Sequence, residues 1–266
     1  MKGTQYPITV SSILLSAVFL LMYLFFQLQL YNGTFLIMFV LLLSIVFLKE
    51  KNRVFAWTII AFFLGEMLLL YGNQLIDQLP ISHSWSEVVK SLLILFPLLF
   101  IFYISKKFKV KFNIYNRRPK WEKAFSLRFS ENRSHVIRVK QLFIALWIIF
   151  LIVFFLLIMR GNVELLNKEI LFGMIVFSIV NGILEEILWR GVLLTKFVSI
   201  VGEHLGLLFI SIAFGFSVLS VEHALAFVPV FFIIGLLFGK LTVSAKSIIV
   251  AINLHIVFNL LMFLTH

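Results

Sequence analysis

Long, uninterrupted apolar runs constrain this chain more than any other feature. Such runs recur from one end of the sequence to the other, and 62% of the 266 residues are hydrophobic. Each run of spanning length can cross a hydrocarbon core about 30 Å thick as a helix, and a helix in lipid satisfies its own backbone hydrogen bonds. The runs do not alternate apolar and polar residues as barrel strands do. The sequence therefore predicts an all-α, multi-pass transmembrane helical bundle.

We expect eight or nine spans, because the second run is short enough to be a tilted or partly re-entrant helix. The first run is too long for the apolar region of a cleaved signal peptide, so we expect it to be retained as a helix. The predicted spans cover residues 7–31, 34–48, 54–75, 88–105, 141–159, 170–198, 204–221, 225–239 and 247–265.

Positive charge is concentrated in one segment between predicted spans. Twelve of the 23 lysines and arginines lie between Lys106 and Lys140, and smaller basic groups at residues 49–53 and 240–246 fall on the same side under this count. Basic loops beside membrane helices mark the cytoplasmic face and can contact anionic lipid. We therefore predict a multi-pass protein of the cell membrane, with the amino terminus and the 106–140 loop in the cytoplasm. In this context anionic lipid, and not nucleic acid, is the expected partner of the loop.

The same basic loop divides the predicted organisation of the chain. Residues 1–105 form amino-terminal membrane helices with few internal charges, residues 106–140 form the cytoplasmic loop, and residues 141–266 form a carboxyl-terminal membrane bundle. This last part holds nearly all of the polar residues expected inside the membrane. The chain contains no cysteine, so neither disulfide bonds nor thiolate chemistry are available to it.

The stretch NGILEEILWRG places Glu185, Glu186 and Arg190 inside an apolar helix. A charged residue at mid-helix costs roughly 2.5–3.5 kcal/mol on insertion scales, which favours a functional role over a structural ion pair. In an α-helix Glu186 and Arg190 share a face, as do Asn181 and Glu185. Two neighbouring carboxylates in a low dielectric resist ionising together and are expected to titrate as a coupled pair. Such coupling can suit one of them to general-base catalysis.

Two further elements carry polar side chains in apolar surroundings. In AINLHIVFNLLMF, His255 and Asn259 lie one turn apart on one face and offer two donors that can stabilise an oxyanion. A lone histidine in such a helix is more often an interhelical hydrogen-bond partner, but the amide one turn away favours a site. Between the two elements, SVLSVEHALAF contains His223, which would be unremarkable by itself.

Taken in order, EEILWR, His223 and HIVFN resemble the motifs of the CPBP family of intramembrane proteases, also called the Abi family (CAAX proteases and bacteriocin-processing enzymes). That family carries EExxxR, FxxxH and HxxxN on core helices. The first and third motifs match in full, whereas Leu219 replaces the phenylalanine of the second. The resemblance covers about residues 170–263.

The resemblance implies roles for six residues. Glu185 would activate water, Glu186 and Arg190 would order the motif, His223 would position the water, and His255 with Asn259 would stabilise the oxyanion. Two histidines and a glutamate are also a familiar catalytic zinc set, so Zn²⁺ held by Glu185, His223 and His255 remains an alternative. The absence of an HExxH motif and the dispersal of these residues over three helices favour the mechanism without metal or other cofactor.

We therefore predict an intramembrane endopeptidase of a membrane-associated peptide or protein. The resemblance suggests bacteriocin or signalling-peptide processing, or self-immunity. Two alternatives belong to other classes: a non-catalytic membrane immunity or scaffold protein that retains the fold, and a transporter whose intramembrane charges relay protons. Paired inverted repeats and broken helices, which would favour a transporter, are not evident. The complete first and third motifs favour the protease over the scaffold. The oligomeric state does not follow from the sequence.

Overall fold

The computed structural model of the chain is almost entirely helical. It describes residues 8–110, 115, 117–125, 137–159, 168–220 and 224–263. In chain order the elements are α1 (Val10–Gln27), α2 (Tyr31–Ser44), the 3₁₀-helix η1 (Ile45–Phe47), α3 (Glu50–Ile76), α4 (His83–Leu92), α5 (Leu95–Lys107), the short strands β1 (Ala124–Phe125) and β2 (Ile137–Arg138), α6 (Val139–Met159), α7 (Lys168–Glu186), the π-helix η2 (Ile187–Leu193), α8 (Leu194–Phe216), the 3₁₀-helix η3 (Ala224–Phe227), α9 (Val228–Ala245) and α10 (Ile249–Phe263).

Six helical segments within the described residues are long and apolar enough to cross a membrane. They are Val10–Gln27, Glu50–Ile76, His83–Lys107, Val139–Leu157, Lys168–Phe216 and Leu225–Ala245. Two shorter apolar helices, Tyr31–Phe47 and Ile249–Met262, accompany them. These lengths and compositions support the predicted all-α membrane bundle. The count of eight or nine spans stays a prediction.

The segment Lys168–Phe216 contains a break at Gly202. Its φ of 83° and ψ of 172° are non-helical, a conformation that glycine adopts without the steric penalty of a side chain. A Cβ placed on Gly206 would lie 2.8 Å from the backbone nitrogen of Val198, and the rings of Phe197 and Phe209 have centroids 6.2 Å apart. The chain therefore folds back on itself after Gly202, between the predicted spans 170–198 and 204–221.

The helices form two compact units that interleave along the chain. The first contains Met1–Glu66, Pro97–Asn113 and Trp189–Gly239, and the second contains Met67–Phe96, Ile114–Leu188 and Lys240–His266. The core of the first unit is an aromatic cluster that uses part of the chain's large phenylalanine content. Phe19 on α1 is fully buried, with its ring 5.0 Å from that of Phe197 on α8 and 5.4 Å from that of Phe62 on α3.

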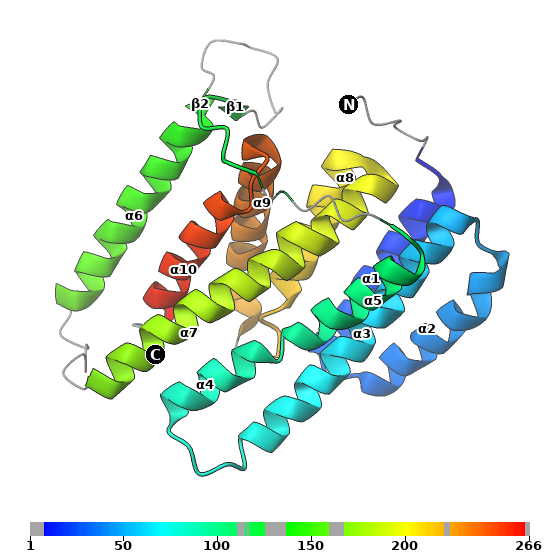
Figure 1. Cartoon of the computed structure of the whole chain (residues 1–266), viewed down its shortest axis with the longest axis horizontal. Coiled ribbons are helices and arrows are strands. Elements are labelled where there is room, and N and C mark those ends of the chain that lie inside the picture. Colours follow the sequence, from blue (N-terminus) through cyan, green and yellow to red (C-terminus); the bar gives the residue numbers. More distant parts are fainter. Residues whose placement is uncertain are drawn as a thin grey trace. The chain divides into compact units, whose positions relative to one another are not determined.

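In the second unit, α7 packs against α4 and α10, and α10 also contacts α6 (Figure 1). Two glycines of α7 allow this close packing. A Cβ on Gly173 would lie 2.6 Å from Cβ of Ser84 on α4, and one on Gly182 would lie 3.0 Å from Cγ1 and 3.2 Å from the backbone nitrogen of Ile256 on α10. Small residues let helix backbones approach in this way. Gly182 therefore brings the end of α7 close to the polar residues of α10.

Candidate functional site

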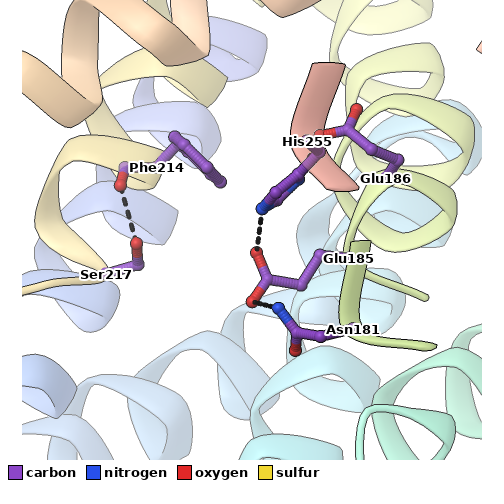
Figure 2. Close-up of polar contacts among 6 residues, drawn as sticks. All are labelled: Asn181, Glu185, Glu186, Phe214, Ser217 and His255. Carbon is purple, nitrogen blue, oxygen red and sulfur yellow. Dashed lines mark hydrogen bonds and ion pairs between the residues drawn. The ribbon is translucent and has the colours of Figure 1, made fainter. Parts of the chain in front are cut away.

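The polar end of α7 presents Asn181, Glu185 and Glu186 in its last turns. Asn181 Nδ2 donates a hydrogen bond to Glu185 Oε1 at 3.1 Å, as expected for residues one helical turn apart. This contact confirms the predicted proximity of these two side chains. It occupies one oxygen of the Glu185 carboxylate and fixes the direction of the other (Figure 2).

His255, on α10, lies against both glutamates. Its Nδ1 is 2.7 Å from Glu186 Oε1, and its Nε2 is 3.6 Å from Glu185 Oε2. In Figure 2 Glu185 extends between His255 on one side and Asn181 on the other. The first distance is a short hydrogen bond and the second is a longer electrostatic contact. Four side chains from two helices thus form one polar cluster, which we call the α7–α10 cluster: Asn181, Glu185, Glu186 and His255.

The two glutamates differ in their exposure to the surroundings. The side chain of Glu186 is fully buried and that of His255 is 3% exposed, whereas the side chain of Glu185 is 28% exposed. A buried carboxylate is costly unless it is paired and hydrogen-bonded, and the Nδ1 contact supplies such a partner to Glu186. Glu185 is consequently the carboxylate of the cluster that an external water molecule or peptide can reach.

Asn259 follows His255 by one turn on the same helix. It is 8% exposed, and its Nδ2 has no hydrogen-bond partner among the residues that the structure describes. An unsatisfied buried amide carries a desolvation cost of about 1–3 kcal/mol, which a ligand carbonyl or a water molecule can relieve. The amide therefore retains a donor for an oxygen that arrives from outside the protein.

Arg190 lies in the π-helix η2, whose backbone conformation differs from that of the α-helix α7 before it. It is fully buried, and its guanidinium carbon lies 4.3 Å from the ring centroid of Phe214 and 5.5 Å from that of Phe238. The sequence-based alignment of Glu186 with Arg190 assumed an uninterrupted α-helix, but the π-helix η2 occupies Ile187–Leu193. A π-helix has i→i+5 hydrogen bonds and a different angular step, and such segments occur frequently at functional sites. The Glu186–Arg190 pair stays a prediction.

The remaining predicted residue, His223, lies outside the described residues, as does its neighbour Glu222. The zinc alternative involves His223 and therefore stays open. Among the side chains that the structure does describe, no group of three or more His, Cys, Asp or Glu residues has a metal-binding arrangement.

Sequence reasoning did not foresee the contact between His255 and Glu186. Helical periodicity relates only residues within one helix. It therefore placed Glu186 on the same face as Arg190, and His255 on the same face as Asn259. No sequence signal locates the π-helix either. The contact depends on how α7 packs against α10.

One comparison with known families gives a match in the carboxyl-terminal part of the chain. Residues 167–261 match the family model of the type II CAAX prenyl endopeptidase Rce1-like proteins. The matched residues contain the whole α7–α10 cluster together with Arg190 and Asn259. The match confirms the resemblance to the CPBP and CAAX proteases over this part of the chain. Neither a curated protein nor a solved structure matches the chain.

Proposed function

We propose that this protein is an intramembrane endopeptidase that hydrolyses a peptide bond in a membrane-associated peptide or protein. The observation that carries the proposal is the contact of His255 with both adjacent glutamates of α7. The family match supports a peptidase in general terms. The particular roles below, and a biological task in bacteriocin or signalling-peptide processing or in self-immunity, belong to the proposal.

Glu185 is proposed as the general base. Its carboxylate is the exposed one, and Asn181 binds one of its oxygens. The other oxygen accepts a proton from a water molecule, whose oxygen then attacks the carbonyl carbon of the scissile bond. Glu185 passes that proton to the departing amine nitrogen as the C–N bond breaks. Proton transfer of this kind by a positioned carboxylate typically contributes about 10²–10⁴-fold to the rate.

His255 and Asn259 are proposed to stabilise the oxyanion that forms on the carbonyl oxygen. Contact between Nδ1 and the buried Glu186 orients the imidazole, so that Nε2 faces the same space as Glu185. For Nε2 to donate to the oxyanion, either the proton of the Nδ1–Oε1 hydrogen bond belongs to Glu186 or the ring carries a proton on both nitrogens. The amide of Asn259, one turn further along α10, supplies a second donor. Preorganised donors of this kind act strongly in a low-dielectric site because they need no reorganisation during the reaction.

Glu186 and Arg190 are proposed to act through other residues. Glu186 is fully buried and contacts His255, so it orients the imidazole without touching the substrate. Arg190 is also fully buried, stacked on Phe214, and it would order the local helix and balance the charge of Glu186. His223 is proposed to help position the water.

The experiment that tests this function compares peptide profiles of membranes that contain the wild-type protein or Glu185→Gln. Glutamine keeps the shape of the side chain and removes its basicity, so the variant should insert normally and fail to cleave. Glu122→Gln is the matched control, because Glu122 is exposed and pairs with Arg138 on the surface. Wild-type cleavage products in membranes that contain well-expressed Glu185→Gln would refute the assignment.

A further inference from the structure

The segment that links α5 to α6 carries a second, separate feature, a folded surface of basic residues. Six exposed cations lie on residues 117–125 and 137–140, which we call the basic platform, and Glu122 is the only acid among these residues. Glu122 pairs with Arg138 at 2.6 Å. The six cations are Arg117, Arg118, Lys120, Lys123, Arg138 and Lys140.

Backbone hydrogen bonds hold the platform in place. β1 pairs with β2, and the pairing continues as the backbone nitrogens of Val139 and Lys140 donate to the carbonyl oxygens of Lys123 and Trp121, at 3.0 and 3.1 Å. These bonds join residues 121–125 to the first turn of α6 (Figure 1). The cations therefore sit on an ordered backbone, and less conformational freedom is lost when they bind a partner.

The same segment is bonded to the turn that precedes α10. The backbone nitrogen of Lys120 donates to the carbonyl oxygen of Ala245 at 2.9 Å, and that of Ile248 donates to the carbonyl oxygen of Tyr115 at 2.9 Å. Within the turn, Nζ of Lys246 lies 5.6 Å from the ring centroid of Tyr115. The platform is thus attached to the start of the helix that carries His255 and Asn259.

The position of the platform along α6 indicates the depth at which it lies in the bilayer. Only 6% of the apolar window Val139–Leu157 is buried by the described residues, as expected for a helix whose surface lipid covers. Lys140, in the first turn of α6, is the only charged residue of that helix. The ring of Trp121 lies 5.1 Å from that of Phe143 in the next turn. Tryptophan and basic side chains at the end of a membrane helix mark the headgroup level.

We infer that the basic platform binds the headgroups of anionic phospholipids and that this binding stabilises the turn before α10. Charge complementarity carries the inference, because six exposed cations with one opposing acid lie beside the first turn of a predicted membrane helix. A preformed cluster of this kind gains affinity from each cation near an anionic surface. The inference does not rest on the peptidase activity proposed above.

The test measures lipid binding by the full-length protein in detergent. Native mass spectrometry would follow titrations with phosphatidylglycerol and, separately, phosphatidylcholine. The variant Arg117→Gln/Arg118→Gln/Lys123→Gln should bind phosphatidylglycerol about 100-fold more weakly than the wild type, since each cation contributes roughly fivefold. Lys123→Gln and Lys168→Gln form a matched pair, because each removes one charge from an exposed lysine. Lys123→Gln should weaken binding about fivefold, whereas Lys168→Gln, at the start of α7 and outside every basic loop, should change it by less than about twofold.

A second measurement tests the connection to α10. The melting temperature of the wild type should be higher in nanodiscs that contain phosphatidylglycerol than in nanodiscs of phosphatidylcholine alone, and the platform variant should lose that difference. Equal loss of binding in Lys123→Gln and Lys168→Gln, or equal binding of the two lipids by the wild type, would overturn the inference. Binding of free glycerol phosphate as tight as that of phosphatidylglycerol would also overturn it, because the site would then recognise a soluble phosphate.

Discussion

The Nδ1 atom of His255 lies 2.7 Å from Oε1 of Glu186, although the two residues are 69 positions apart in the chain. This contact joins α10 to the end of α7 and turns the other ring nitrogen of His255 towards Glu185, 3.6 Å away. A carboxyl group hydrogen-bonded to one nitrogen of an imidazole fixes which way the ring faces. The arrangement leads to the following predictions.

Glu186 and His255 should behave as one unit in a double-mutant cycle. His255→Ala removes an oxyanion donor and should lower kcat by about 100- to 1,000-fold. Glu186→Ala should lower kcat by a similar factor, because the imidazole loses its orienting partner. The double variant should be little worse than either single variant, as expected for residues in direct contact. The measurement is kcat in reconstituted membranes, and effects that multiply independently would contradict the coupling.

Asn181 should prove to be a positioning residue for Glu185. Asn181→Ala removes the donor to Glu185 Oε1, and loss of a hydrogen bond to a charged group corresponds to at most about a 10- to 100-fold change in rate. Asn181→Asp should be more harmful, because it places a third carboxylate beside Glu185 and Glu186. The reduction should appear in kcat with KM nearly constant, and unchanged kcat in both variants would remove Asn181 from the mechanism. Asn253→Ala is the matched control, because the exposed Asn253 amide donates to the carbonyl oxygen of Ile249 in its own helix.

Arg190→Ala should reduce expression and thermal stability as well as activity. The side chain is fully buried and stacked on Phe214. Its predicted pair with Glu186 would lose one partner, which for a buried charge pair costs about 3–5 kcal/mol. Arg190→Lys should recover only part of the stability, since a lysine keeps the charge and loses the planar stacking. Arg138→Ala, which breaks an exposed ion pair, should have little effect on the melting temperature. A normal melting temperature for Arg190→Ala would contradict the structural role.

The active protein should work without a bound transition metal. If Glu185 activates water while His255 and Asn259 bind the oxyanion, a zinc ion would duplicate both tasks. The measurement combines elemental analysis of active, purified protein with activity in a chelator. Stoichiometric zinc, with inactivation by the chelator that added zinc reverses, would instead make Glu185, His223 and His255 metal ligands.

The sequence by itself determined the helical membrane class of the fold and one contact of the candidate site. Runs of apolar residues determine membrane helices because transfer into lipid depends on each segment's own composition. The contact between Asn181 and Glu185 follows from helical periodicity, which relates residues four positions apart whatever surrounds them. The family match over residues 167–261 agrees with the motifs read from the sequence.

Only the tertiary structure decided which charges meet. Gly182 lets α7 approach Ile256 on α10. This approach places Glu186 beside His255, so the contact joins two helices and not two residues of the same helix. The π-helix at Ile187–Leu193 is likewise a feature that helical periodicity in the sequence did not predict. Distances between helices depend on packing by side chains from distant parts of the chain, so no local pattern of residues contains them.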